Sequence, residues 1–508
     1  SFPVEEGDGP RQKGNLNRLA TEGAVNSASN SIVEQYSAPY VLFLKATNTE
    51  MGLLGLAQHL ANVIAQIPGA KLAQHFSRKS VWIATQLAAK LLLVPLAILP
   101  LLFPNPVTIA IAILGLVSFF INLRKPAWIS LLGDIVPQEM RAQYFGKRNA
   151  LIGISGFVST LLAGVILALY GFSVIFFLSI LLGVMIVFYF AKIHEPAMGK
   201  RRHSYHYNLS SSIESVREAA TINRSFIMLT SYMTYINFAI EMVVPFIVVY
   251  MLKDLGLSYA EFGMVVALGV LSKVISSRYW GRMSGKFGDR TLIGVTGILV
   301  CFVPLGYVLS SNVYHIALLR LYDGFVFAGF ELMTFDYLLN ITPQDKRPSY
   351  IGGHHFFTGI GAILGALVGV LLVGQVESSS FAFLQGLQIL FMLSFILRLG
   401  ALGFIPFISE TSSKAEGIPF RHIFAEAVAL EPVREIKYTV GESFRVPYNI
   451  GKGEVERIGR LHSRPAIRDV EFGISYRLMR LSTWLRFKMI ALKNMRRHSY
   501  RIGRELVD

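Results

Sequence analysis

The sequence predicts an all-α membrane protein whose twelve transmembrane helices form two six-helix repeats around a central cavity, followed by a cytoplasmic C-terminal tail. The first observation is composition, since 53% of the 508 residues are hydrophobic and only 16% are charged. The second is that the apolar residues come in blocks of roughly twenty, a length that crosses about 30 Å of hydrocarbon. The third is a polar stretch that occurs twice. A large soluble enzyme would show shorter apolar runs interrupted by charge.

The repeated stretch reads GDIVPQEMRAQYFGKRN at 133–149 and NITPQDKRPSYIGGHH at 340–355. The offset between the copies is constant and needs no gap (343 − 137 = 206). The matched pairs include Pro137 with Pro343, Glu139 with Asp345, Arg141 with Arg347, Tyr144 with Tyr350 and Gly146 with Gly352. We expect each copy to be a polar loop between two apolar helices, which predicts two copies of one membrane unit.

The apolar runs give the expected helices in order. In the first repeat they lie near 19–45, 51–69, 80–102, 107–131, 149–170 and 172–192. In the second they lie near 225–251, 258–279, 291–310, 313–339, 351–374 and 381–408. The expected domains are a cytoplasmic N-terminal segment (1–18), a six-helix bundle (19–192), a basic cytoplasmic linker (193–224), a second six-helix bundle (225–408) and a basic cytoplasmic tail (409–508).

Basic residues predict the orientation, because Lys and Arg gather in alternate loops. One set of loops holds Arg78, Lys79, Arg141, Lys147, Arg148, the KRRH of the linker, Lys286, Arg290, Lys346 and Arg347. The other set holds only Lys45 and Lys253. Basic loops remain on the cytoplasmic side, so both termini are expected there, in a multi-pass protein of the plasma membrane. The polar amino end is not typical of a signal peptide, and a single cysteine, Cys301, excludes an internal disulfide.

The tail carries a surplus of positive charge, 19 − 12 = +7. Its segment 474–495 has the pattern of a basic amphipathic helix, with an apolar face that begins at Ile474 and Leu478. Such a helix favours anionic lipid headgroups as its partner. Docking onto the loops of the same chain and binding to another partner are the alternatives. No nucleic-acid motif accompanies the charge, so nucleic acid is not an expected partner.

Small residues at four-residue spacing predict close helix packing. They are Ala57, Ala61, Ala65 and Gly69 in the second helix, and Gly361, Gly365 and Gly369 in the eleventh. Subtracting 206 from the last three gives Ser155, Ser159 and Ala163 in the fifth helix, which are also small. The repeat therefore preserves packing surfaces as well as the polar stretch.

Polar and ionisable residues at membrane depth lie on the first and fourth helices of each repeat, and such residues are usually functional. They are Glu22, Asn26, Asn30 and Glu34, then Arg124 and Lys125, then Asn237 and Glu241, and finally Arg320, Asp323 and Glu331. The offset places Lys125 opposite Glu331 (331 − 206 = 125). These faces are expected to meet in a shared, wet cavity that binds substrate or couples protons.

Structural interpretations stand beside these functional ones. Glu22 could be solvated at a helix end, Arg124 or Lys125 could form a structural ion pair, and Arg320 could only pair with Asp323. His354 and His355 could be ordinary interfacial histidines. No metal-ligand spacing, nucleophile motif or phosphate-binding glycine loop is evident. We therefore expect no metal, no cofactor, no catalytic residue and no enzymatic activity.

Two further segments, AKLAQHFSRK (70–79) and GRMSGKFGDR (281–290), align with each other and resemble the helix 2–3 loop signature of the major facilitator superfamily, G-x-x-x-D-[RK]-x-G-[RK]-[RK]. The match is partial, because Gln74 and Gly285 occupy the acidic position. The resemblance covers about 16–408. It implies a monomer in which helices 1, 4, 7 and 10 line the cavity. It also implies that helix 2 packs on helix 11, and helix 5 on helix 8, across the two halves. The small-residue stripes fit this packing. The resemblance also implies cytoplasmic gate loops holding Arg78, Lys79, Glu139, Arg141, Gly281, Lys286, Arg290, Asp345 and Arg347.

The functional hypothesis is a secondary active transporter that moves a small solute by alternating access, coupled to protons through Glu34, Glu241, Asp323 and Glu331. Solute and proton can compete for a carboxylate in such a cavity, and Lys125 or Arg124 would hold an anionic group of the solute. An exporter of amphipathic or cationic drugs is the alternative, because aromatic neighbours such as Phe327 suit cations. An alternative of another class is a transporter-like sensor or scaffold that signals through the tail.

Overall fold

The computed structural model describes residues 10–136, 141–193, 195, 217, 223–343, 347–376, 379–381 and 384–409. Nearly all of these residues are helical, and within these ranges nine helices are long and apolar enough to cross a membrane. The predictions that involve Glu139, Asp345, the side chain of Arg141, most of the linker and the tail after 409 lie outside the described residues.

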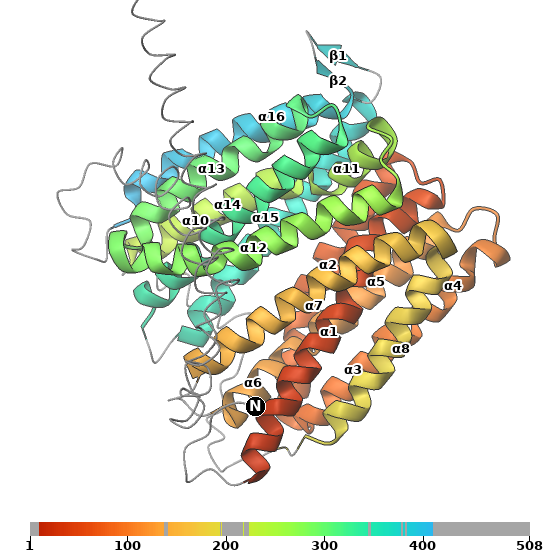
Figure 1. Ribbon diagram of the computed structural model, residues 1–508. Helices are drawn as coiled ribbons and strands as arrows, with labels where there is room; N and C mark the ends of the chain where they lie inside the picture. Colours follow the sequence, from red (N-terminus) through yellow and green to blue (C-terminus); the bar gives the residue numbers. More distant parts are fainter. Residues whose placement is uncertain are drawn as a thin grey trace, which may run out of the picture. The chain divides into compact units, whose positions relative to one another are not determined.

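Figure 1 shows the helices in two groups, which we call the first and second halves. The first half contains α1 (Pro10–Phe43), α2 (Asn48–His75), α3 (Arg78–Leu91), α4 (Leu93–Leu102), α5 (Val107–Leu123), α6 (Lys125–Ile135), α7 (Arg141–Tyr170) and α8 (Phe172–Ala191). The second half contains α10 (Arg224–Glu241), α11 (Val244–Val249), the π-helical turn η2 (Tyr250–Asp254), α12 (Tyr259–Phe287), α13 (Asp289–Leu309), α14 (Val313–Ile341), α15 (Arg347–Val376), the strands β1 (Ser380–Phe381) and β2 (Leu384–Gln385), α16 (Leu387–Ala401) and the 3-10 turn η3 (Leu402–Phe407).

Three helices that were expected to be continuous are interrupted. The expected helix 107–131 breaks at Arg124, and the expected helix 225–251 breaks after Glu241. In both cases the next helix has a proline in its first turn, where proline is tolerated but ends the hydrogen-bonding of the preceding helix. The expected helix 80–102 is divided at Leu92. The breaks place a cation, Arg124, and a carboxylate, Glu241, at the ends of helices.

The expected helix 381–408 is wrong at its start. An antiparallel pair of two-residue strands occupies the region instead, with Ser380 opposite Gln385. The helix α16 begins only after Gly386, which has a positive φ of 52° that favours glycine.

The repeated polar stretch is mostly helix, so the expectation of a loop is wrong. Residues 141–149 belong to α7 and residues 347–355 belong to α15. Within them, Tyr144 is 1% exposed, and its hydroxyl donates to the carbonyl of Leu16 in α1 at 3.1 Å. Tyr350 is 3% exposed and packs edge-on against Phe226 in α10, with ring centroids 4.9 Å apart. In each half the repeated tyrosine therefore fixes the start of one helix to the start of another.

The small-residue stripes pack within the halves, which corrects the expectation that they serve contacts across them. Gly69 lies against the backbone of Leu123 in α5. Gly361 and Gly365 lie against backbone carbonyls of α10, and Gly369 lies against that of Met242, the residue that follows α10. The hydroxyls of Ser155 and Ser159 each donate to a carbonyl of α1 at 2.7 Å.

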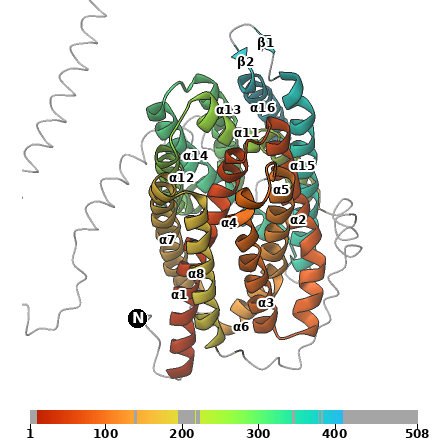
Figure 2. The same cartoon turned by 90° about the vertical axis from the view of Figure 1, so that its right-hand side faces the viewer.

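The contacts across the halves join α2 to α15 and α7 to α12, as expected (Figure 2). Different small residues make them close. A Cβ on Gly52 of α2 would lie 2.7 Å from Cγ2 of Val370 in α15, and a Cβ on Gly164 of α7 would lie 2.9 Å from the Cα of Gly263 in α12. Gly55 of α2 makes a further close contact across the halves, because its Cβ would lie 2.6 Å from the ring of Pro245 in α11.

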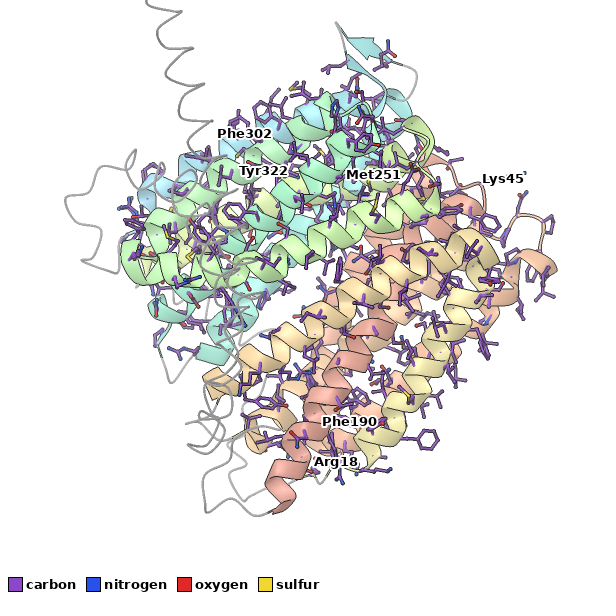
Figure 3. The ribbon with its side chains drawn as sticks, in the orientation of Figure 1. Arg18, Lys45, Phe190, Met251, Phe302 and Tyr322 are labelled. Carbon is purple, nitrogen blue, oxygen red and sulfur yellow. The ribbon has the colours of Figure 1, made fainter. Side chains whose placement is uncertain are left out.

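The hydrophobic core shows that the halves meet at one end. One cluster of buried residues combines both halves and includes Tyr40, Met51, Phe246 and Tyr250. Two further clusters each lie within one half, around Trp82 and around Trp280. We call the end with the shared core the closed end, where Lys45 and Met251 lie, and the opposite end, where Arg18 and Phe190 lie, the basic end (Figure 3).

Candidate functional site

A cavity of about 680 Å³ lies between the halves. It is lined by residues of α2 from the first half and of α10, α12, α14 and α15 from the second. Its polar lining consists of His59, Asn62, Gln66, Asn237, Glu241, Lys273, Ser277, Glu331, Thr334, His354, His355 and Thr358. Within the described ranges, no group of three or more His, Cys, Asp or Glu side chains is arranged to hold a metal ion.

Only part of the expected lining is brought together here. Asn237, Glu241 and Glu331 line the cavity, which fits the expectation for helices 7 and 10. Among the residues that line it, none comes from α1, α5 or α6. Glu34 and Lys125 are nevertheless exposed, and Lys125 lies within electrostatic range of Glu34 and of the lining residue His355.

One polar contact in the cavity crosses the halves. Nε2 of His59 in α2 lies 2.9 Å from Oε2 of Glu241 in α10, and the two side chains are 25% and 19% exposed. Glu241 is the last residue of α10, at the helix break. Sequence reasoning missed His59, although an ionisable residue in the middle of an apolar helix was the available signal.

A second ion pair lies within the second half. Nζ of Lys273 in α12 lies 2.7 Å from the carboxylate of Glu331 in α14, and both side chains are about half exposed to the cavity. The repeat offset makes Lys125 the first-half equivalent of Glu331, with the opposite charge. The repeat offset relates equivalent positions, whereas the neighbouring helix in the same half supplies the actual partner.

Two other expected residues pair beside the cavity. Arg320 donates to Asp323 at 2.5 Å along α14, as the structural interpretation expected. Arg398 of α16, which sequence reasoning missed, is 2% exposed and donates to the hydroxyl of Ser394 at 3.2 Å. Neither Arg320 nor Asp323 lines the cavity.

Glu22 is buried, which corrects its interpretation as a solvated helix-end residue. It is 1% exposed, and its Oε2 lies 3.6 Å from Nη2 of Arg148 in α7. Arg124 is also buried and lies within electrostatic range of Glu22. The guanidinium of Arg148 lies 5.0 Å from the ring centroid of Trp128, and that of Arg124 lies 5.6 Å from the ring centroid of Trp82. Neither oxygen of Glu22 has a hydrogen-bond partner among the described residues.

The rest of the α1 stripe turns toward α3. Asn30 bonds to Asn26 at 3.3 Å and accepts from Nζ of Lys90 at 3.2 Å. Lys90 is 2% exposed and also donates to Ser179 of α8. Sequence reasoning missed Lys90. Its signal was a row of large side chains spaced by four residues along α3, namely Arg78, Trp82, Gln86 and Lys90, of which all but Trp82 are polar.

The expected gate residues that the structure describes make contacts within a half. Arg78 pairs with Asp134 and with Glu195, and Nζ of Lys79 donates to the carbonyl of Ile193 at 2.9 Å. In the second half, Arg290 donates to the carbonyl of Pro406 at 3.5 Å, and Arg347 to that of Leu339 at 3.0 Å. A Cβ on Gly281 would reach only Leu332 at 3.8 Å, and Lys286 lies in the last turn of α12.

Comparisons with known proteins agree with this architecture. A family model described as Major Facilitator Superfamily matches residues 20–246 and 227–430. The multi-drug resistance efflux pump PmrA of Streptococcus pneumoniae is 27% identical over 194 residues, which cover 37% of this chain and 46% of that protein. The quinolone resistance protein NorA of Staphylococcus aureus is 28% identical over 178 residues, which cover 35% of this chain and 45% of that protein. The chain thus spans less than half the length of either relative.

Solved structures share the fold at low identity. The nucleoside transporter NupG superposes with a TM-score of 0.61 at 13% identity and covers 78% of this chain and 100% of its own. The D-xylose-proton symporter gives a TM-score of 0.61 at 12% identity, covering 79% and 99%. The chain is therefore a multi-pass integral membrane protein.

Proposed function

The chain belongs to the major facilitator superfamily, and we propose that it is a proton-coupled secondary transporter that exports amphipathic cations by alternating access. In this proposal twelve spans form two repeats, and the basic end faces the cytoplasm with both termini. The tail after 409 lies on anionic headgroups of the plasma membrane.

The cavity between the halves is the observation that carries the proposal. It holds two carboxylates, Glu241 and Glu331, at a depth where charge is costly. The shared core lies at the closed end, and separate cores lie within the halves. A cavity with polar groups whose two walls belong to separately packed bodies is what alternating access requires.

The cavity suits a cation better than an anion. Its cation Lys273 is already bound to Glu331, so an incoming anion would meet a compensated charge. A cation could instead bind at Glu241, whose partner His59 is not a permanent cation, or replace Lys273 at Glu331, with Met233, Leu332 and Phe335 supplying apolar contact. The two relatives, a multi-drug resistance efflux pump and a quinolone resistance protein, support export of the same class of solute.

Proton coupling follows from the same carboxylates. Of the four expected to carry protons, Glu241 and Glu331 line the cavity, Glu34 is exposed near Lys125, and Asp323 is bound to Arg320. A proton and a cationic solute that compete for one carboxylate exchange across the membrane as the halves move.

An anionic solute is the second candidate, and one observation favours it. Lys125 is exposed at the helix break after Arg124 and lies within electrostatic range of His355 in the opposite half. An anion held there would touch both halves.

Transport by purified protein in liposomes tests the proposal. We expect an imposed proton gradient to drive accumulation of ethidium, a permanent amphipathic cation, and not of a matched anionic dye. Glu331→Gln should reduce ethidium transport at least tenfold and alter its dependence on the gradient. Glu261→Gln is the matched control, because glutamine keeps the capping box that begins α12. Accumulation of the anionic dye alone, lost in Lys125→Ala, would replace the cation proposal with the anion one.

A further inference from the structure

We infer that His59 and Glu241 form a bond between the halves that closes the cavity on the side of the closed end. A cation bound by Glu241 displaces His59, and the halves then separate at the closed end. The inference rests on the proposed function and deepens it. It assigns to His59 the role of a positioning residue, which couples solute binding to movement of the halves.

The position of His59 along α2 is the first support. Gly52, Gly55, His59, Asn62 and Gln66 are spaced by three or four residues, so they share one face of the helix. Gly52 and Gly55 meet side chains of the second half at the closed end, whereas Asn62 and Gln66 line the cavity. His59 is therefore the boundary between the packed part of this face and the open part.

The position of Glu241 is the second support. It ends α10, and the chain turns there before α11 begins at Val244, with Pro245 in its first turn. The same Pro245 packs on Gly55, one turn of α2 from His59. The polar contact of Glu241 with His59 and the tight apolar contact of Pro245 with Gly55 therefore both lie at this helix break. A change in the partner of Glu241 acts where α10 and α11 can tilt relative to each other.

The two carboxylates of the cavity differ in which half supplies their partner. Glu331 is held by Lys273, and both belong to the second half. Exchange of that partner changes the charge of the cavity but frees no contact between the halves. Glu241 is held by a residue of the first half, so exchange of its partner removes a bond between them. The two carboxylates therefore differ in effect: a cation at Glu331 changes only the charge of the cavity, whereas a cation at Glu241 also removes the bond to the first half.

The chemistry allows the exchange. An imidazole N–H donates one hydrogen bond to a carboxylate whether the ring is neutral or charged. A permanent cation offers a full charge to the same group. Because Glu241 is 19% exposed and lines the cavity, a solute can reach its carboxylate while His59 is still bound.

The experiment measures exposure of the closed end. Ala46 is 1% exposed, and its carbonyl accepts a bond from Lys253 of the second half at 3.4 Å. We would place Ala46→Cys in a Cys301→Ser background and measure its labelling by a maleimide in detergent, with and without ethidium. Cys301 is fully buried, and serine retains its bond to the carbonyl of Gly297.

We expect slow labelling in the parent, accelerated by ethidium. His59→Leu should label about tenfold faster without ethidium, the effect of losing one hydrogen bond to a charged group, and should respond little to it. His59→Gln, which can still donate, should restore slow labelling. Lys273→Gln removes the ion pair with Glu331, which lies within one half, and the Ala46→Cys site should then be labelled at the parental rate.

Labelling of His59→Leu at the parental rate overturns the inference, even if ethidium is transported. Equal acceleration in Lys273→Gln also overturns it, because any loss of cavity charge would then open the closed end. If His59→Leu labels fast while ethidium neither binds nor is transported, the bond between the halves is supported and the cationic substrate is rejected.

Discussion

Arg148 lies over Gly23 so closely that a Cβ there would be 2.7 Å from its Nη2, and this approach brings the guanidinium to within 3.6 Å of the buried Glu22. Because Gly23 has no side chain, the guanidinium of Arg148 can approach α1 and pair with the neighbouring residue, Glu22. The pair lies inside the first half, outside the residues that line the cavity.

Removal of one partner of this pair should be costly. We expect Arg148→Met to lower the free energy of unfolding by about 3 kcal/mol, because it leaves an uncompensated buried carboxylate. The exposed Arg278→Met is the control and should change it little. The double variant Glu22→Gln/Arg148→Met should recover part of the loss. Thermal unfolding in detergent measures all three, and equal stability of the two arginine variants would contradict the expectation.

Lys90 and Gly183 should behave as a coupled pair. A Cβ on Gly183 of α8 would lie 2.5 Å from the Cγ of Lys90 and 2.8 Å from its Cδ. Gly183→Ala should therefore destabilise the parent by about 1–3 kcal/mol through overpacking. In a Lys90→Ala background the same change should cost little, because the lysine stem is gone. A double-mutant cycle on unfolding checks this, and additive effects would show that the two positions are independent.

The crossing of α7 and α12 depends on two glycines. A Cβ on Gly164 would meet the Cα of Gly263 at 2.9 Å and the hydroxyl of Tyr36 at 2.8 Å. We expect Gly164→Ala to lower thermal stability and to speed maleimide labelling of Ala46→Cys, because the helices must separate near the closed end. Gly115→Ala is the control, since its Cβ would make an ordinary contact of 3.6 Å with Ala57. Unchanged labelling in Gly164→Ala would argue against a tight crossing.

Glu195 predicts a pH dependence at the basic end, outside the spans. Partial burial acts to raise the pKa of its carboxyl, but hydrogen bonds from Ser77 and Arg78 together lower it below its ordinary value of 4.5. Such a group contributes stability that is complete above the ordinary pKa and is lost as the pH falls through the lower, folded pKa. The contribution should therefore be constant from pH 7 to about pH 5.

The measurement is the difference in melting temperature between the parent and Glu195→Gln. We expect a constant difference at neutral and mildly acidic pH that shrinks only below pH 4.5. A difference that begins to shrink near pH 6 would mean that the carboxyl has a raised pKa in the folded protein.

Much of the fold could be predicted because it depends on local properties of the chain. The length of each apolar run sets which segments become long helices. The ends were less accurate where short-range signals competed, as at Gly386, where a positive φ delays α16, and at Pro126 and Pro245, which divide apolar runs that look continuous. Prolines within helices such as Pro68 interrupt nothing, so the residue type alone could not mark the breaks.

The partners of polar residues were the part that could not be predicted. The partner of Glu331 is Lys273 of the neighbouring helix α12, and the repeat offset, which relates equivalent positions, does not indicate it. Glu22 is buried because α7 brings Arg148 over it, and nothing in the sequence near Glu22 states which helix covers it.

The sequence by itself determined that this chain is a helical membrane protein with an internal repeat, since hydrophobic length and self-similarity are written along the chain. Only the tertiary structure decided that His59 meets Glu241, 182 positions away, and that small residues such as Ser155 serve packing within a half. The physical reason is that lipid leaves helix association to close contacts and polar bonds. These depend on how helices rotate and cross, which no single segment specifies.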